Sequence, residues 1–276
     1  MVKRKKSNKE GKSKRFLKAL WKVLFFLIKI PYFIVKGLIT LFRKTKTKIE
    51  KENIEDQRES MSANYSQFKV IKTVSGNFKK WEDKISNSDS TIGLILGARG
   101  TGKTAFGLKI LENIYANKKN KKNFYVMGFK ENDMPSWIDV VNNTSEIKNN
   151  SLILIDEGGV LFSSRKAMTN ANKILSELLL IARHKNISII FISQNSSNLE
   201  VNAIRQADYI LLKPSSLLQK DFERKKIREI YEGIESDFKI FKDVKGIAYI
   251  YSDDFQGFVD NPLPSFWNQK ISKSFS

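Results

Sequence analysis

The sequence predicts an α/β fold in which a mainly parallel sheet is flanked by helices. From residue 91 onward, short β-branched apolar runs alternate with helical patterns, as expected for successive βαβ units. One turn between a run and a helical pattern holds three glycines and ends in a Lys-Thr pair. A basic, apolar segment of different composition precedes this region. We therefore expect an N-terminal arm (1–48), a charged linker with a lead-in strand and helix (49–90) and one domain (91–276).

The composition of the chain excludes some kinds of functional site and shows where its positive charge lies. The chain has 276 residues and no cysteine, which excludes disulfides and thiolate metal sites. Its single histidine, His184, argues against a histidine-based metal centre. Of the net charge of +20, residues 1–48 carry +15 and the other 228 residues only +5. The basic character therefore belongs mainly to the arm, and is no evidence that the rest of the chain grips DNA.

The arm begins with a basic, polar stretch without apolar periodicity, which predicts disorder over residues 1–15. Residues 16–42 are strongly apolar. Their four lysines, which share one narrow stripe of a helical wheel, are Lys18, Lys22, Lys29 and Lys36. This amphipathic pattern suits a helix at a membrane interface with anionic headgroups. We expect a membrane-associated protein whose domain of residues 91–276 lies in the cytoplasm.

The geometry of residues 16–42 stays open at this point. A spanning helix has the length, but Lys29 near its centre costs roughly 2.5–3.5 kcal/mol, and Pro31 bends it. Basic flanks on both sides mildly favour an in-plane or hairpin geometry. A helix buried against the protein's own core or a sister subunit is the alternative without a membrane. The length of the apolar region and the lack of a small-residue cleavage site argue against a signal peptide.

The remaining elements follow in chain order. Residues 49–60 carry seven charges of mixed sign and predict a solvated helix or linker. Residues 68–74 alternate as in a strand, and residues 77–85 predict a short helix. Six further strands are predicted at 91–96, 123–129, 151–156, 187–193, 208–213 and 246–252. The first three of these and the fifth are nearly continuous apolar runs, which is typical of strands buried on both faces of a parallel sheet.

The glycine-rich turn matches the phosphate-loop pattern G-x-x-x-x-G-K-[ST] in full, directly after a strand and before a helix. Backbone N–H groups of such a loop, with the positive end of the following helix, surround a phosphate chain. We expect Lys103 to reach the β- and γ-phosphates and the Thr104 hydroxyl to ligate Mg²⁺. The predicted nucleotide-binding residues are Gly97, Ala98, Arg99, Gly100, Thr101, Gly102, Lys103, Thr104 and Ala105.

Two later strand ends carry polar side chains. Asp156 and Glu157 close a buried run, where Asp156 is placed to hold the metal through water and Glu157 to activate the attacking water. The pair favours ATP hydrolysis over a small-molecule kinase role. Gln194 follows the run 187–193, and we expect it near the γ-phosphate if the two strands are neighbours.

The phosphate loop, "LILIDE", a helix ending "LLLIARHKNI" and "IIFISQN" together resemble the FtsK/HerA superfamily of P-loop motor ATPases, including the Zot-type and related archaeal and viral ATPases. The resemblance covers about residues 91–215. It implies a RecA-like P-loop NTPase fold, with the glutamine strand between the two phosphate-binding strands. The usual Thr-Gln ending is Ser193-Gln194 here, which keeps the hydroxyl. The resemblance also implies a ring, usually a hexamer, with ATP sites between subunits. In many members of the superfamily, DNA is threaded through the centre of this ring.

A site between subunits needs a cation from the neighbour. Arg183 is the first candidate by position and Arg205 the second, although both also fit surface helix residues. Residues 217–230 have roughly helical apolar spacing (Leu217, Leu218, Phe222, Ile227, Ile230) with basic residues between them. This helix either offers a basic face to DNA or a neighbour, or is simply solvated.

These features favour a membrane-tethered ring ATPase that translocates or packages DNA, with ATP and Mg²⁺ as cofactors. Two alternatives stay open. One is a Zot-like ATPase for virion or pilus assembly or extrusion, whose cargo is a virion or secretion protein. The other is a nucleotide-gated membrane scaffold with little turnover.

Overall fold

The computed structural model describes residues 18, 20–22, 25, 36, 40, 43–46, 48–117, 121–163, 167–268 and 270–271. The chain divides into two compact units, Met1–Asp56 and Gln57–Ser276. The described residues of the first unit are helical and carry exposed ion pairs one helical turn apart, such as Lys48–Glu52 at 3.7 Å. Most of residues 16–42 lie outside the described residues. Within the part that is described, no helix combines the length and the apolar composition that a membrane crossing requires.

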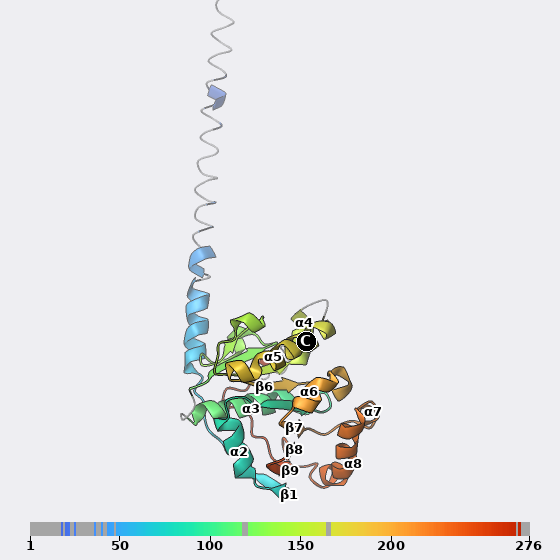
Figure 1. Ribbon diagram of the computed structural model, residues 1–276. Coiled ribbons are helices and arrows are strands. Elements are labelled where there is room, and N and C mark those ends of the chain that lie inside the picture. Colours follow the sequence, from blue (N-terminus) through green and yellow to red (C-terminus); the bar gives the residue numbers. More distant parts are fainter. Residues whose placement is uncertain are drawn as a thin grey trace, which may run out of the picture. The chain divides into compact units, whose positions relative to one another are not determined.

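The second unit contains one mixed sheet (Figure 1), in which nine strands are described in the order β1-β9-β8-β7-β2-β6-β5-β3-β4. The strands from β7 to β4 run parallel to one another, whereas β8 pairs antiparallel with β7 and β9, and β1 antiparallel with β9. The bounds are β1 Val70–Gly76, β2 Ile92–Leu96, β3 Asn123–Met127, β4 Asp139–Val140, β5 Ser151–Asp156, β6 Ile187–Ile192, β7 Tyr209–Leu212, β8 Ala248–Ser252 and β9 Phe255–Val259.

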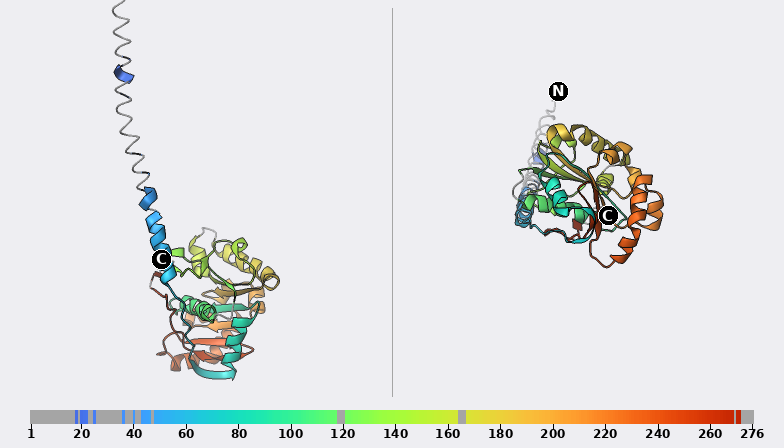
Figure 2. Two further views of the ribbon diagram at one scale, coloured as in Figure 1. Left: turned by 90° about the vertical axis from the view of Figure 1, so that its left-hand side faces the viewer. Right: turned by 60° about the horizontal axis from the view of Figure 1, so that its bottom comes forward.

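Helices cover both faces of this sheet, as Figures 1 and 2 show. Their bounds are α2 Phe78–Asn87, α3 Lys103–Ala116, α4 Glu157–Ser163, α5 Ala167–Lys185, α6 Val201–Gln206, α7 Leu217–Asp221 and α8 Lys225–Ile240. One hydrophobic cluster joins α2 and α3 to the sheet, and the other joins α5, α6 and α8 to it. Side chains of successive strand residues alternate between the clusters, so that Leu94 and Leu96 belong to one and Ile95 to the other.

The continuous apolar runs form the strands that were predicted, because each is buried on both faces. Every residue of β2, β5 and β6 is buried. β6 lies between β2 and β5, the order that the resemblance to motor ATPases implies. Since all three strands are parallel, their carboxyl ends meet at one edge of the sheet, directly beside the glycine-rich turn.

Two features differ from the sequence expectation. The compact unit begins at Gln57 rather than at residue 91, because β1 pairs with β9 and α2 buries Phe78, Trp81 and Ile85. The helical pattern over residues 217–230 is broken into α7 and α8. Ile227 is fully buried in α8, whereas Leu218 and Phe222 are 75% and 70% exposed. The two groups therefore do not share one helical face.

Candidate active site

The glycine-rich turn forms a loop between β2 and α3. Gly102 precedes the first residue of α3 with φ 84°, a left-handed conformation that favours glycine. Gly97 leaves β2 with φ 146°, and a Cβ there would lie 2.6 Å from the Cβ of Lys213 on the neighbouring β7 segment. The backbone can curl at this point only because both positions lack a side chain.

Lys103 lies inside this loop. Its Nζ donates hydrogen bonds to the carbonyls of Gly97 at 2.8 Å and Ala98 at 2.9 Å, and the residue is only 8% exposed. Burial lowers the pKa of the Lys103 ammonium, although the nearby carboxylates of Asp156 and Glu157 oppose this effect. A phosphate chain entering the loop would replace two neutral carbonyl partners with charged oxygens, which make stronger hydrogen bonds.

Asp156 ends β5 opposite the first turn of α3. Its Oδ2 accepts a 2.7 Å hydrogen bond from the Thr104 hydroxyl, and its Oδ1 accepts one from the Gly158 N–H at 3.1 Å. Burial raises the pKa of the Asp156 carboxyl, against the hydrogen bond from Thr104 and the charge of Lys103. A hydroxyl and a carboxylate this close, beside a phosphate loop, form the oxygen donor set that Mg²⁺ takes together with phosphate oxygens. The residues present therefore fit the metal that the phosphate loop implies.

Glu157 is held by the segment that follows β6. Its Oε2 accepts a 2.5 Å hydrogen bond from the Ser193 hydroxyl, and the Gln194 N–H and the Asn198 side chain also bond the carboxylate. Glu157 is 5% exposed, and burial raises the pKa of its carboxyl, while these hydrogen bonds oppose the rise. The register explains the contact, because Asp156 pairs with Ile192, one residue before Ser193. A buried carboxylate held in this way is placed to accept a proton.

Residues 103–210 match the model of the family described as zonular occludens toxin (Zot). The match runs from Lys103 through the acidic end of β5 and Ser193–Gln194 to β7. Over this stretch the chain resembles the Zot family. Together with the loop, the Thr104–Asp156 contact and the buried Glu157, the match identifies a P-loop ATPase. No curated protein matches the chain.

Several solved structures are similar to this P-loop ATPase. The DNA-packaging ATPase from Sulfolobus Turreted Icosahedral Virus is 16% identical, with 64% of this chain and 99% of that chain covered and a TM-score of 0.43. ATPases 2 and 3 of EssC from Geobacillus thermodenitrificans are 11% identical, with 68% and 43% covered and a TM-score of 0.39. The N-terminal domain of zonular occludens toxin from Neisseria meningitidis is 15% identical, with 67% and 97% covered and a TM-score of 0.34.

Other residues predicted for the site of this ATPase are exposed, and two of them lie apart from the phosphate loop. Gln194 is exposed just past β6, between the ends of β2 and β5. Arg99 is exposed on the phosphate loop. Arg183 and Arg205 are exposed in the last turns of α5 and α6, which lead into β6 and β7 at the amino edge of the sheet. The fold therefore separates both arginines from the phosphate loop of their own subunit by the length of a strand.

Ser193 and Asn198 were not predicted as partners of Glu157. Both lie in the connection after β6, and their contact with Glu157 depends on the pairing of β5 with β6. The one signal in the sequence is the hydroxyl residue directly before Gln194. The environment of Lys213 was missed as well. This residue is fully buried behind Gly97, and its Nζ donates to the carbonyl of Gly246 at 2.6 Å.

Proposed function

We propose that the chain is an ATP-hydrolysing ring motor of the FtsK/HerA type that translocates or packages DNA. The observation that carries this proposal is the position of Glu157. It lies beside Asp156 at the carboxyl edge of the sheet, next to a complete phosphate loop, and is held by the segment that also bears Gln194. This arrangement supports hydrolysis, because a carboxylate base is placed close to the metal-binding residues.

Each residue of the site has its own role in the proposed hydrolysis of ATP. Loop N–H groups and Lys103 bind the phosphates, and Thr104 with Asp156 would hold Mg²⁺, which would neutralise phosphate charge when bound. Glu157 accepts a proton from water as the water oxygen forms its bond to the γ-phosphorus. The bond from that phosphorus to the β–γ bridging oxygen breaks, and ADP and phosphate are released. In this proposal, the Gln194 amide orients the water or responds to loss of the γ-phosphate.

A ring supplies the cation that this site still needs. Arg183 and Arg205 lie exposed at the amino edge of the sheet, so a neighbouring subunit is the way to bring either guanidinium to the phosphates. Arg183 is our first choice, because α5 leads directly into the strand that carries Ser193 and Gln194. The proposed assembly is a homo-oligomeric ring, usually a hexamer in the family that the sequence resembles.

The nature of the cargo is the point on which the alternatives differ. The match to the Zot family supports an assembly or extrusion ATPase that acts on a virion or secretion protein. The modest net charge outside the arm supports the same alternative, since a DNA channel is expected to be more basic. Two basic side chains of the 217–230 region also have partners within the protein. Lys220 pairs with Glu235 at 2.8 Å, and Arg224 donates to the Ser196 carbonyl at 3.0 Å. A slowly cycling nucleotide-gated scaffold is the third possibility.

ATPase rates with and without duplex and single-stranded DNA test these proposals. Lys103→Ala should abolish nucleotide binding and turnover, whereas Glu157→Gln should still bind ATP but fail to hydrolyse it. Lys130→Ala is a matched control, because Lys130 is exposed and distant in sequence from the site residues. Turnover by Lys103→Ala at the wild-type rate would refute the assignment of the site.

The same measurement separates the three functions. Stimulation by DNA supports a DNA motor. A rate that ignores DNA but responds to a coat-like or pilin-like partner supports the assembly ATPase. Tight ATP binding with no turnover under any condition supports the scaffold.

The membrane association proposed for residues 16–42 has its own test. In a flotation assay, the full chain should rise with vesicles that contain anionic lipid. A variant without residues 1–48 should remain in the bottom fraction and keep its basal ATPase rate. The deletion ends before Gln57, where the compact unit begins, so the fold of that unit is not cut. Equal flotation of both proteins would contradict the proposal.

A further inference from the structure

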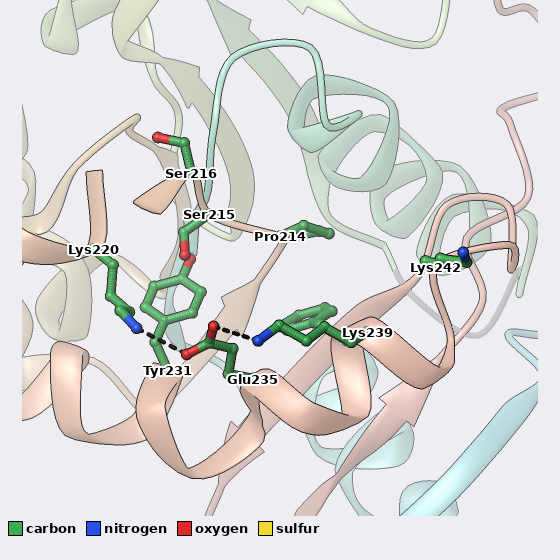
Figure 3. A pocket seen from close by; sticks show the side chains of 9 residues that line it. Pro214, Ser215, Ser216, Lys220, Tyr231, Glu235, Lys239 and Lys242 are labelled. Carbon is green, nitrogen blue, oxygen red and sulfur yellow. Dashed lines mark hydrogen bonds and ion pairs between the residues drawn. The ribbon is translucent and has the colours of Figure 1, made fainter. Parts of the chain in front are cut away.

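A cavity of about 650 Å³ lies between the end of β7 and helices α7 and α8. Figure 3 shows the side chains that line it. Pro214, Tyr231 and Phe238 provide apolar surface, and the remaining lining residues are Ser215, Ser216, Lys220, Glu235, Lys239 and Lys242. The volume falls within the range of small-molecule sites, which is roughly 300–1,000 Å³.

The cavity adjoins the phosphate loop. The Ala98 N–H of that loop donates a 3.0 Å hydrogen bond to the carbonyl of Pro214, which lines the cavity. One residue earlier, the Lys213 N–H donates to the Leu96 carbonyl at 2.8 Å. The wall of the cavity and the phosphate loop therefore leave the sheet side by side. A ligand held on this end of the loop would therefore lie next to the cavity wall.

Strand order shows which end of a nucleotide faces the cavity. β7 and β6 flank β2 on opposite sides, and β5, with Asp156 at its end, lies beyond β6. The γ-phosphate belongs on the β6–β5 side, where Glu157 and the proposed metal ligands are. A triphosphate that runs along the loop then points its nucleoside end toward β7, which is the side of the cavity.

The lining chemistry fits a nucleoside. The hydroxyl of Tyr231 donates to the Lys213 carbonyl at 3.0 Å, so that this ring is fixed in the wall. Phe238 is partly exposed and packs edge-on against Phe258, with ring centroids 5.2 Å apart. At the rim, Glu235 bridges Lys220 at 2.8 Å and Lys239 at 2.9 Å (Figure 3). Flat apolar walls with a polar rim suit a heteroaromatic base and its sugar.

We propose that this cavity binds the nucleoside half of the triphosphate whose phosphates lie on the glycine-rich loop. The base packs against Phe238 and Pro214, and the sugar lies nearer to Ser215 and the loop. The inference rests on the proposed function, and it assigns the part of the ligand that the phosphate-binding residues do not contact. It also gives α7 and α8 a role in binding, although they lie after the last residue of the family match.

The test fills the cavity and compares two ligands. Ser215→Trp places a large ring in the cavity, and Ser236→Trp makes the same change on an exposed position of α8 outside the lining. We expect Ser215→Trp to weaken ATP binding at least tenfold while tripolyphosphate, which has no nucleoside, binds within about twofold of the wild-type affinity. Ser236→Trp should change neither. Isothermal titration calorimetry of the purified full chain measures both ligands.

The outcomes separate this inference from the proposed function. If wild type binds neither ligand, the phosphate-loop assignment itself fails. If wild type binds both and Ser215→Trp weakens neither, or both equally, the nucleoside is not in this cavity. Photocrosslinking of wild type with 8-azido-ATP is independent of how the variant folds. It should label peptides within residues 214–242, and labelling confined to other peptides would overturn the inference.

Discussion

At the scale of single residues, the site depends on a contact that joins two strands. Glu157 follows β5, but the Ser193 hydroxyl that holds it follows β6, at 2.5 Å. We expect Ser193→Ala to lower kcat by about ten- to a hundredfold, less than loss of the base itself, because the carboxylate loses a positioning donor. KM for ATP should change little, since Ser193 contacts none of the predicted phosphate-binding residues. Steady-state kinetics gives both values.

Two further variants make this expectation specific. Ser193→Thr keeps the hydroxyl and should restore most of kcat, whereas a packing defect would not be repaired in this way. Ser197→Ala removes a hydroxyl from an exposed position in the same connection and should be silent. If Ser193→Ala raises KM and leaves kcat unchanged, Ser193 does not act through Glu157.

Lys213 gives a second expectation at this scale, which concerns stability. Burial lowers its pKa to about 7 in the folded chain from 10.5, against a small opposing effect of Asp260. Below pH 7 the Lys213 amine is protonated in both the folded and the unfolded chain. The folded chain then bears the full free-energy cost of burying this charge. Between pH 7 and 10.5 the folded state binds fewer protons than the unfolded state, so the free energy of unfolding rises with pH.

Urea unfolding of Lys213→Met between pH 7 and pH 9 tests this expectation. The variant lacks the rise, so its midpoint relative to wild type should fall steadily as the pH increases. Lys245→Met, a change at an exposed lysine, should show a constant difference. A constant difference for Lys213→Met as well would show that the buried amine does not titrate in this range.

At the scale of elements, α3 does more than carry the phosphate loop. Lys109 and Glu112 form a buried ion pair at 2.7 Å, and Glu112 also accepts hydrogen bonds from the N–H groups of Asn64 and Ser265. The pair thus fastens the lead-in segment and the C-terminal segment to one helix. Glu112→Gln leaves the Lys109 charge buried without its partner, which should cost about 3–5 kcal/mol of unfolding free energy.

Urea denaturation checks this value. Glu177→Gln is the control, since Glu177 forms an exposed pair with Lys173 at 3.9 Å, and such pairs contribute about 0–1 kcal/mol. The two variants lose the same charge on a helix and differ in burial. Equal losses would mean that burial of the Lys109–Glu112 pair is not what makes it important.

The elements also show how much of the fold can be predicted from the sequence. β2, β5 and β6 were predictable because strands buried on both faces are continuous apolar runs. β4 has two residues, too few for any pattern. β9 forms a hairpin with the preceding β8, but its pairing with β1 joins residues far apart in the sequence. The phosphate loop was recognisable because its chemistry is local. The Ser193–Glu157 contact and the cavity beside β7 were not, because each needs the strand order.

At the scale of the whole molecule, the positions of the arginines predict complementation between subunits. Lys103→Ala has a defective loop but an intact Arg183, and Arg183→Ala is the reverse. In a closed ring mixed at random in equal amounts, about a quarter of the interfaces combine an intact loop with an intact arginine. We therefore expect two nearly inactive proteins to recover about a quarter of the wild-type ATPase rate after mixing and exchange.

The same mixing with Arg205→Ala in place of Arg183→Ala tells the two candidates apart, because only the arginine that reaches the neighbour's phosphates gives both inactivity alone and recovery together. Size-exclusion chromatography with light scattering verifies that the mixed rings form. Mixed rings that form without any recovery would place the cation within the subunit.

The anchoring of Arg58 has a mechanical consequence. Its guanidinium donates to the carbonyls of Met134 and Ile138 at 3.1 Å each and pairs with Glu131 at 2.6 Å, one residue after the compact unit begins. A pulling force applied to the chain before Arg58 would act on these Arg58 contacts before it acts on any strand. A load carried by the N-terminal arm would thus be borne next to β3 and β4, while β1, which follows in the chain, stays shielded from it at the far edge of the sheet.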